Sequence, residues 1–197
     1  MKRLEFEARC RRDFDTRFSG TTLVMVVIQE TRVISVNVGD SRAILGCRDH
    51  AGRVMSHSLT QDHLPDEPDE FSRIMDAGGR IYRTLSPSSP PEYMPSGRKR
   101  PHVWGPSRVW LPEIDAPGLA MSRSLCDDVI HTVGVTSTLE FREHHFDHCK
   151  DCVLVIATDG LWQYLSNQEV IDIAMRECEP SKASGRSDIG DSLSLRR

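Results

Sequence analysis

The chain has 197 residues, of which 38% are hydrophobic and 27% charged, and its formal net charge at pH 7 is −4. This composition is typical of one globular domain that is long enough to bury a core. The charge gives no support to nucleic-acid binding, and no apolar run approaches the roughly 20 residues of a membrane-spanning helix. Six irregularly spaced cysteines and a charged N-terminus favour reduced thiols in an intracellular protein, cytoplasmic or nuclear.

The first third of the chain predicts paired strands after a charged N-terminal segment. Residues 2–17 are compatible with a helix, although their apolar residues are irregularly spaced. Residues 21–28 and 32–38 are rich in β-branched types and flank a short polar turn, which predicts a hairpin. Residues 42–47 and 53–60 predict a second pair of strands. We therefore expect antiparallel sheet in this part of the chain.

Residues 69–77 predict a short helix, with Phe71, Ile74 and Met75 on one face and two glycines ending it as a C-terminal cap. The segment at about 80–110 then changes character, because prolines break any regular element. A flexible surface loop is one interpretation. The basic residues 98–100 and 108 leave open a second one, in which the insert contacts a phosphorylated substrate.

Residues 153–157 form an apolar run that is too short for a soluble helix and predicts a strand buried on both faces. Asp159 and Gly160 follow it. A rigidly held carboxylate beside a glycine turn is suited to bind a hard metal ion. Acceptance of backbone hydrogen bonds in a turn is the alternative role for Asp159.

A helix is predicted from Ser166, because Ser166 and Glu169 have the spacing of a capping box. Val170, Ile173 and Ala174 would form its apolar stripe. Residues 180–197 are rich in Ser, Gly and Arg, which predicts a disordered tail. We thus expect one domain over residues 1–179, with the insert at about 80–110, followed by the tail.

Five segments occur in one order that resembles the metal-dependent Ser/Thr protein phosphatase family, the type 2C class. They are Ser-Gly-Thr-Thr at 19–22, Asn-Val-Gly-Asp-Ser-Arg-Ala at 37–43, Leu-Ala-Met-Ser-Arg-Ser at 119–124, Ala-Thr-Asp-Gly-Leu-Trp at 157–162 and Leu-Ser-Asn-Gln-Glu-Val at 165–170. The phrases at 59–65, 73–79 and 108–112 also fit, and the last is similar to plant and protist members. The resemblance covers roughly residues 16–175.

The resemblance implies an α/β (α+β) fold in which two packed antiparallel sheets are flanked by helices. It implies hydrolysis of phosphoserine and phosphothreonine in proteins through a dinuclear Mg²⁺ or Mn²⁺ centre, whose ions activate water and clamp phosphoryl oxygens. Asp159 matches a ligand of that centre, and Asp40 matches a position that joins the Asp159 counterpart at a third, weaker metal site in some members. A turn aspartate after a strand is the alternative role for Asp40. Partners would be phosphorylated proteins, with no nucleic acid or membrane, and the full-length form would be monomeric.

Two positions depart from the family pattern. Gln163 stands where the family usually has Asp or Glu, and a neutral amide is a weaker ligand for a hard cation. Cys126 replaces a glycine, which predicts an altered or strained turn next to Asp127, a residue that we interpret as structural.

The family's Asp-Gly-His-Gly-Gly turn and its late Asp-Asn strand have no counterpart here, so we expect a central fragment, incomplete at both ends. Two functions stay open: a phosphatase that is active in its full-length form although this chain is inactive, and a non-catalytic pseudophosphatase that binds phosphoproteins or regulates a partner. An alternative metal site, for zinc, would consist of His144, His145, His148, Cys149 and Cys152. It holds only one Cys-x-x-Cys pair, which disfavours zinc.

Overall fold

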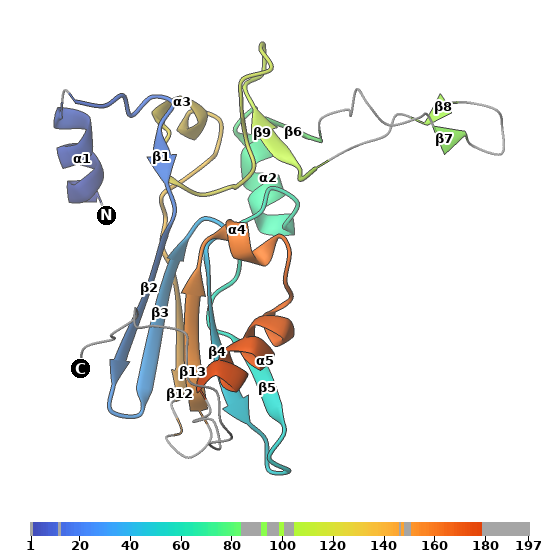
Figure 1. The fold of residues 1–197 in the computed structure, drawn as a ribbon. Coiled ribbons are helices and arrows are strands. Elements are labelled where there is room, and N and C mark those ends of the chain that lie inside the picture. Colours follow the sequence, from blue (N-terminus) through green and yellow to red (C-terminus); the bar gives the residue numbers. More distant parts are fainter. Residues whose placement is uncertain are drawn as a thin grey trace, which may run out of the picture.

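The computed structural model describes residues 2–11, 13–83, 92–93, 99–100, 105–145, 147 and 151–178. It is a mixed α/β structure of antiparallel sheets and helices (Figure 1). No helix in these ranges is both long and apolar enough to cross a membrane. The cysteine pair 149 and 152, the basic residues 98–100 and the predicted tail lie wholly or partly outside the residues whose side chains can be described.

Two three-stranded antiparallel sheets form the centre of the fold. The first has the order β12-β3-β2 and the second the order β13-β4-β5. Their strands are β2 (Leu23–Gln29), β3 (Arg32–Val38), β4 (Arg42–Arg48), β5 (Val54–Ser58), β12 (Glu140–His145) and β13 (Asp151–Ala157). The predicted hairpins β2–β3 and β4–β5 are confirmed, and each is completed by a strand from the last third of the chain.

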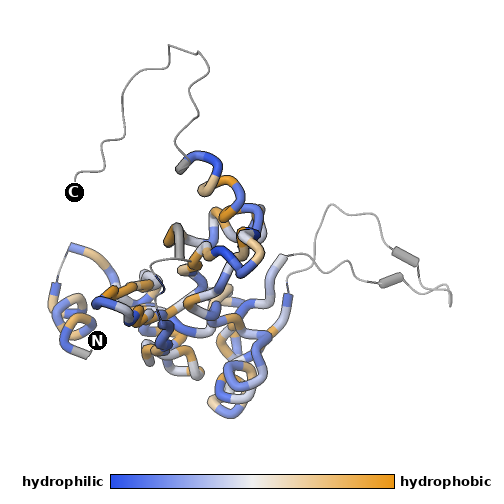
Figure 2. Tube along the Cα trace, turned by 90° about the horizontal axis from the view of Figure 1, so that it is seen from below, coloured by the Kyte–Doolittle hydropathy of each residue, from blue (hydrophilic) through white to orange (hydrophobic). Residues whose placement is uncertain are grey.

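The two sheets pack face to face through apolar side chains from both. Val33 of β3 and Leu45 of β4 are almost fully buried in one cluster, with Val24, Val26 and Leu154 at its border. Burial of this kind stabilises a fold by about 25 cal/mol per Å² of apolar surface. In Figure 2 hydrophobic and hydrophilic segments alternate along the tube, as expected where one side of each element faces a core.

Helix α5 (Asn167–Cys178) covers the outer face of the β13-β4-β5 sheet (Figure 1). Its start is the predicted capping box: the Ser166 hydroxyl and backbone N–H both donate to Glu169, and the Glu169 N–H donates back to the Ser166 hydroxyl. The predicted apolar stripe is partly wrong. Val170 is buried, but Ile173 is exposed, and Ile171 and Met175 complete the buried face.

Smaller elements lie beyond one end of the two sheets, the end at which the β3–β4 turn lies (Figure 1). They are α1 (Lys2–Cys10), β1 (Gly20–Thr21), α2 (Pro68–Asp76), β6 (Arg80–Tyr82), β9 (Arg108–Trp110), β10 (Pro117–Leu119), β11 (Leu125–Cys126), α3 (Asp128–His131) and α4 (Asp159–Trp162). Strands β10, β9 and β6 form one small sheet, and β1 pairs with β11. Within the insert, β7 (Glu92–Tyr93) pairs with β8 (Lys99–Arg100).

Two predictions about burial are only partly right. Strand β13 packs on both faces, with Leu154 in the core between the sheets and Val153 and Val155 under α5, but it is an edge strand and Ile156 is 45% exposed. An apolar run alone does not show how many neighbours a strand has. On α2, Ile74 is buried but Phe71 and Met75 are exposed, and the charged Glu70 is buried instead.

Candidate functional site

Asp40 lies in the turn that joins β3 to β4. The preceding Gly39 has a φ of +100°, and a Cβ built there would lie 2.4 Å from Cγ2 of Thr22. Only glycine therefore fits, because it alone combines this dihedral with such a close approach. Gly39 thus allows the tight turn that carries Asp40.

Asp159 lies at the end of β13, as the sequence indicates, but its surroundings differ from the prediction. Thr158 is the N-cap of α4, and Asp159 is the first residue of this short helix. Gly160 has no positive φ, and the only atom near a Cβ built there is the Thr158 hydroxyl oxygen at 3.8 Å. The sharp glycine turn predicted at Gly160 is therefore wrong, and the helix start sets the direction of Asp159.

Asp40 and Asp159 line the same cleft, which has a volume of about 890 Å³. Burial raises the pKa of Asp40, and the negative charge of Asp159 raises it further. The two carboxylates are thus close enough to repel each other, and Asp40 is partly shielded from water. Repulsion of this kind is relieved when a cation binds between the groups.

Gln163 also lines the cleft and contacts Asp159. Its Nε2 donates a hydrogen bond of 2.5 Å to Oδ2 of Asp159. The amide therefore presents a donor to the carboxylate instead of a further oxygen ligand. That Gln163 weakens the third metal site stays a prediction.

A third carboxylate of the cleft, Asp62, was missed by the sequence reasoning. It forms a two-point ion pair with Arg42 at 2.9 and 2.7 Å, so its charge is already compensated. Arg42 also donates to Asn167 at 2.6 Å and lies over the Trp162 ring, 5.2 Å from its centroid. These contacts join the Asp40 turn to α4 and α5. Asp62 lies in the segment 59–65, which is part of the family resemblance, but the resemblance assigns no role to this aspartate.

The residues of the cleft fit Mg²⁺ or Mn²⁺ in chemistry. Both ions prefer oxygen ligands, and Mg²⁺ is commonly held by one or two carboxylates together with water and substrate phosphates. Asp40 and Asp159 offer two such groups. Among the described residues no group of three or more His, Cys, Asp or Glu side chains could hold a metal, so these two aspartates are an incomplete ligand set.

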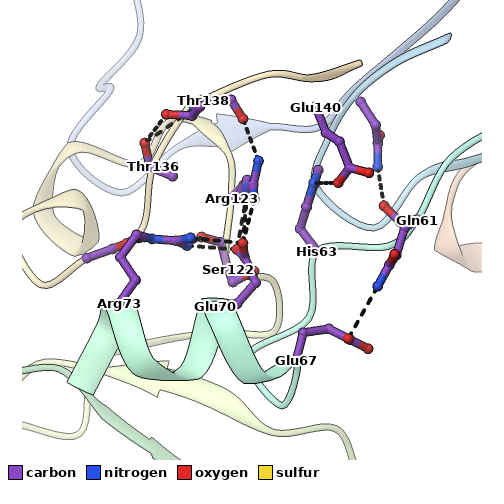
Figure 3. A network of polar contacts seen from close by, with 12 residues as sticks. Gln61, His63, Glu67, Glu70, Arg73, Ser122, Arg123, Thr136, Thr138 and Glu140 are labelled. Carbon is purple, nitrogen blue, oxygen red and sulfur yellow. Dashed lines mark hydrogen bonds and ion pairs between the residues drawn. The ribbon is translucent and has the colours of Figure 1, made fainter. Parts of the chain in front are cut away.

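Close to the cleft, the buried residues His63 and Glu70 belong to a polar network (Figure 3). Glu70 accepts hydrogen bonds from Arg73, Arg123 and the Ser122 hydroxyl. Burial opposes ionisation of Glu70, but these donors outweigh it and lower its pKa from 4.5 to about 2. The network ties α2 to the Met-Ser-Arg segment that borders the cleft.

The turn at Cys126 is strained, as the replacement of a glycine predicts. Cys126 and Asp127 have φ values of 65° and 53°, a region that favours glycine. Backbone bonds hold the turn: the N–H of Asp127 donates to the carbonyl of Ser19, and the Asp127 carbonyl accepts from Ile130. The structural role expected for the Asp127 side chain stays a prediction.

A sequence profile of the protein phosphatase 2C family matches residues 4–187. The chain belongs to the protein phosphatase 2C family. Probable protein phosphatase 2C 75 of Oryza sativa subsp. japonica is 36% identical over 186 residues, which are 94% of this chain and 39% of that protein. Probable protein phosphatase 2C 72 of Arabidopsis thaliana is 38% identical over 161 residues, 81% of this chain and 43% of that protein.

Solved structures agree with this fold. The crystal structure of serine-threonine phosphatase 2C from Toxoplasma gondii matches with a TM-score of 0.68 at 24% identity, over 89% of this chain and 52% of that one. A C. elegans sex determining protein matches with a TM-score of 0.64 at 17% identity, over 89% of this chain and 36% of that one. The chain thus spans less than half the length of these curated relatives and about half or less of these structures.

Proposed function

We propose that this chain is the central part of a metal-dependent protein serine/threonine phosphatase domain. Its full-length form would hydrolyse phosphoserine and phosphothreonine in proteins. The observation that carries the proposal is the convergence of Asp40 and Asp159, each at a strand end, on one cleft where their charges repel. Family membership and the oxygen chemistry of the two ligands support the same function.

Asp40 and Asp159 would hold Mg²⁺ or Mn²⁺ in this cleft. A bound divalent ion lowers the pKa of water and neutralises charge on phosphoryl oxygens. The protein fixes the ligands: Gly39 allows the turn that carries Asp40, and α4 sets the direction of Asp159. Arg42, held by Asp62 and Asn167, begins β4 and pairs with Ala157 at the end of β13.

The domain assignment is part of the proposal. Residues 1–179 would form the phosphatase-like domain, the insert at about 80–110 would border its cleft, and residues 180–197 would be a tail. Arg108 and Gly105 line the cleft beside Asp40 and Asp159, which supports this place for the base of the insert. We further propose phosphorylated proteins as substrates, an intracellular location and a monomeric full-length form.

A non-catalytic role as a pseudophosphatase is the second candidate. The contact between Gln163 and Asp159 favours it, because the amide occupies a lone pair of the proposed ligand. In this reading the cleft would bind a phosphoprotein without cleaving it.

Hydrolysis of a phosphothreonine peptide in the presence of Mn²⁺ separates the two candidates. The 197-residue chain should be inactive under either proposal, because its ligand set is incomplete. A version extended at both ends with the missing family strands should be active if the first proposal holds. Its Asp159→Ala variant should then lose orders of magnitude in rate. An inactive extended chain that still binds the peptide would favour the second proposal, and an active Asp159→Ala variant would refute the site.

A further inference from the structure

His63 lies directly behind the turn that carries Asp40. Its exposed fraction is 2%. The backbone N–H of Gly39 donates to Nδ1 of His63 at 3.0 Å, and the backbone N–H of His63 donates to the carbonyl of Gly39, also at 3.0 Å. One residue therefore holds both polar groups of the glycine that precedes Asp40.

The hydrogen bonds determine which nitrogen of His63 carries the proton. Nδ1 accepts from Gly39, so its lone pair is free of a proton, and Nε2 must be the protonated nitrogen that donates to Oε2 of Glu140 at 2.9 Å. Burial and the nearby positive charge of Arg123 lower the pKa of His63, in keeping with a neutral ring. Glu140 is itself fixed by Arg142, whose Nε donates at 2.6 Å. Figure 3 shows the ring of His63 directed at Glu140.

The surrounding segment also holds the two sides of the turn. Before the turn, Nδ2 of Asn37 donates to the carbonyls of Gly39 and Gln61. After the turn, the N–H of Ala43 donates to the hydroxyl of Thr60 at 3.0 Å. Residues 60–63 thus contact the turn at several points.

Gly39 itself gives the turn little rigidity, because glycine has the widest range of backbone conformations. A position that must be glycine for steric reasons therefore needs its conformation fixed by partners. In this chain His63 supplies the partner for the N–H, and Glu140 fixes the ring that accepts it.

We propose that His63, oriented by Glu140, is a positioning residue that fixes the Gly39–Asp40 turn and so sets the place of the Asp40 carboxylate. The value of this placement for metal binding rests on the proposed function. The placement of the turn itself does not depend on any metal.

Two conservative variants of His63 test the hydrogen bonds of its two ring nitrogens separately. In His63→Asn the amide oxygen can replace Nδ1 as the acceptor for Gly39, whereas the contact with Glu140 is lost. In His63→Gln the amide nitrogen can replace Nε2 as the donor to Glu140, whereas the acceptor for Gly39 is lost. Both remove the ring from a buried site, so a role limited to packing would affect both alike.

The first measurement is the ¹H–¹⁵N NMR signal of the Gly39 amide in the metal-free 197-residue chain. We expect a signal near the wild-type position in His63→Asn and an upfield proton shift with faster solvent exchange in His63→Gln. The second measurement is Mn²⁺ affinity from water-proton relaxation. We expect about a tenfold loss in His63→Gln and a much smaller loss in His63→Asn, because outer partners of metal ligands commonly contribute about 10–100-fold.

Glu140→Ala keeps His63 and provides the test if both ring variants unfold. It should shift the imidazole ¹⁵N signals of His63 and broaden the Gly39 amide. Glu143→Ala is the matched control, since Glu143 lies on the same strand and pairs with Arg32 in solvent, and it should change neither signal.

Equal effects of His63→Asn and His63→Gln on the Gly39 amide, or an unchanged Gly39 amide in Glu140→Ala, would overturn the proposal. If Mn²⁺ binding proves insensitive to Asp40→Asn, the proposed metal site fails, while the Gly39 amide still decides whether His63 holds the turn.

Discussion

Replacing Glu70 with Gln tests the buried network that ties α2 to Ser122 and Arg123. The side chain of Glu70 is only 5% exposed, so solvent screens its charge little. The fall of its pKa from 4.5 to about 2 means that folding favours the ionised form, and at about 1.4 kcal/mol per pKa unit this contributes about 3 kcal/mol at neutral pH. Glu70→Gln should therefore lower the free energy of unfolding by about 3 kcal/mol, near the roughly 3–5 kcal/mol typical of a broken buried ion pair.

Urea denaturation at pH 7 and pH 3.5 measures this difference. Because the folded pKa of Glu70 lies below the unfolded value, its contribution is complete above about pH 4.5 and disappears as the pH falls toward about 2. The gap between wild type and Glu70→Gln should thus shrink to about 2 kcal/mol at pH 3.5.

The exposed pair of Arg32 and Glu143 supplies the control. Its side chains are 59% and 57% exposed, and pairs of this kind contribute roughly 0–1 kcal/mol, so Glu143→Gln should change little. A gap below about 1 kcal/mol for Glu70→Gln, or one that stays constant between the two pH values, would refute the reasoning.

Three further predictions concern the cleft and the sheets. The chain should bind Mn²⁺ with a Kd of about 1 mM, or about −4 kcal/mol, and titration should show weaker binding in Asp40→Asn and in Asp159→Asn; unchanged binding in the double variant would place the metal elsewhere. Gln163→Glu should tighten Mn²⁺ binding in the same titration, because a carboxylate replaces a donor next to Asp159, and an unchanged affinity would contradict this. Met25 and Phe141 are 47% and 62% exposed on the outer face of the β12-β3-β2 sheet. The chain should therefore self-associate in sedimentation velocity, and it should do so less after both residues are changed to Lys. A monodisperse wild-type monomer would contradict this.

Local signals account for the parts of the fold that could be predicted from the sequence. The β2–β3 and β4–β5 hairpins join neighbouring segments across short turns, and the α5 capping box involves residues three positions apart. In these cases the information lies within a few residues of the element. The resemblance to the family supplied the two-sheet arrangement that joins them.

The features that the sequence did not reveal depend on distant partners. The burial of Glu70 could not be foreseen, because its charge is compensated by Arg123, far along the chain. Strand β13 lies at the edge of its sheet because, among the described strands, it pairs with β4 alone. An apolar run does not indicate how many strands will pair with it. The error at Gly160 has another cause: strand-end glycines often form turns, but here a helix begins at Asp159.

The pairing order of the central sheets has a consequence for synthesis on the ribosome. Strands β4 and β5 can pair as soon as both have emerged, but β13, the other neighbour of β4, follows about a hundred residues later. At about 5–20 residues per second, that delay is roughly 5–20 s. The inner face of the early hairpin can pack on β2 and β3, but its outer face, which α5 covers in the folded chain, is exposed throughout this interval, when chaperones and aggregation compete for it. Slow translation between β5 and β13 would therefore lower the yield of folded protein.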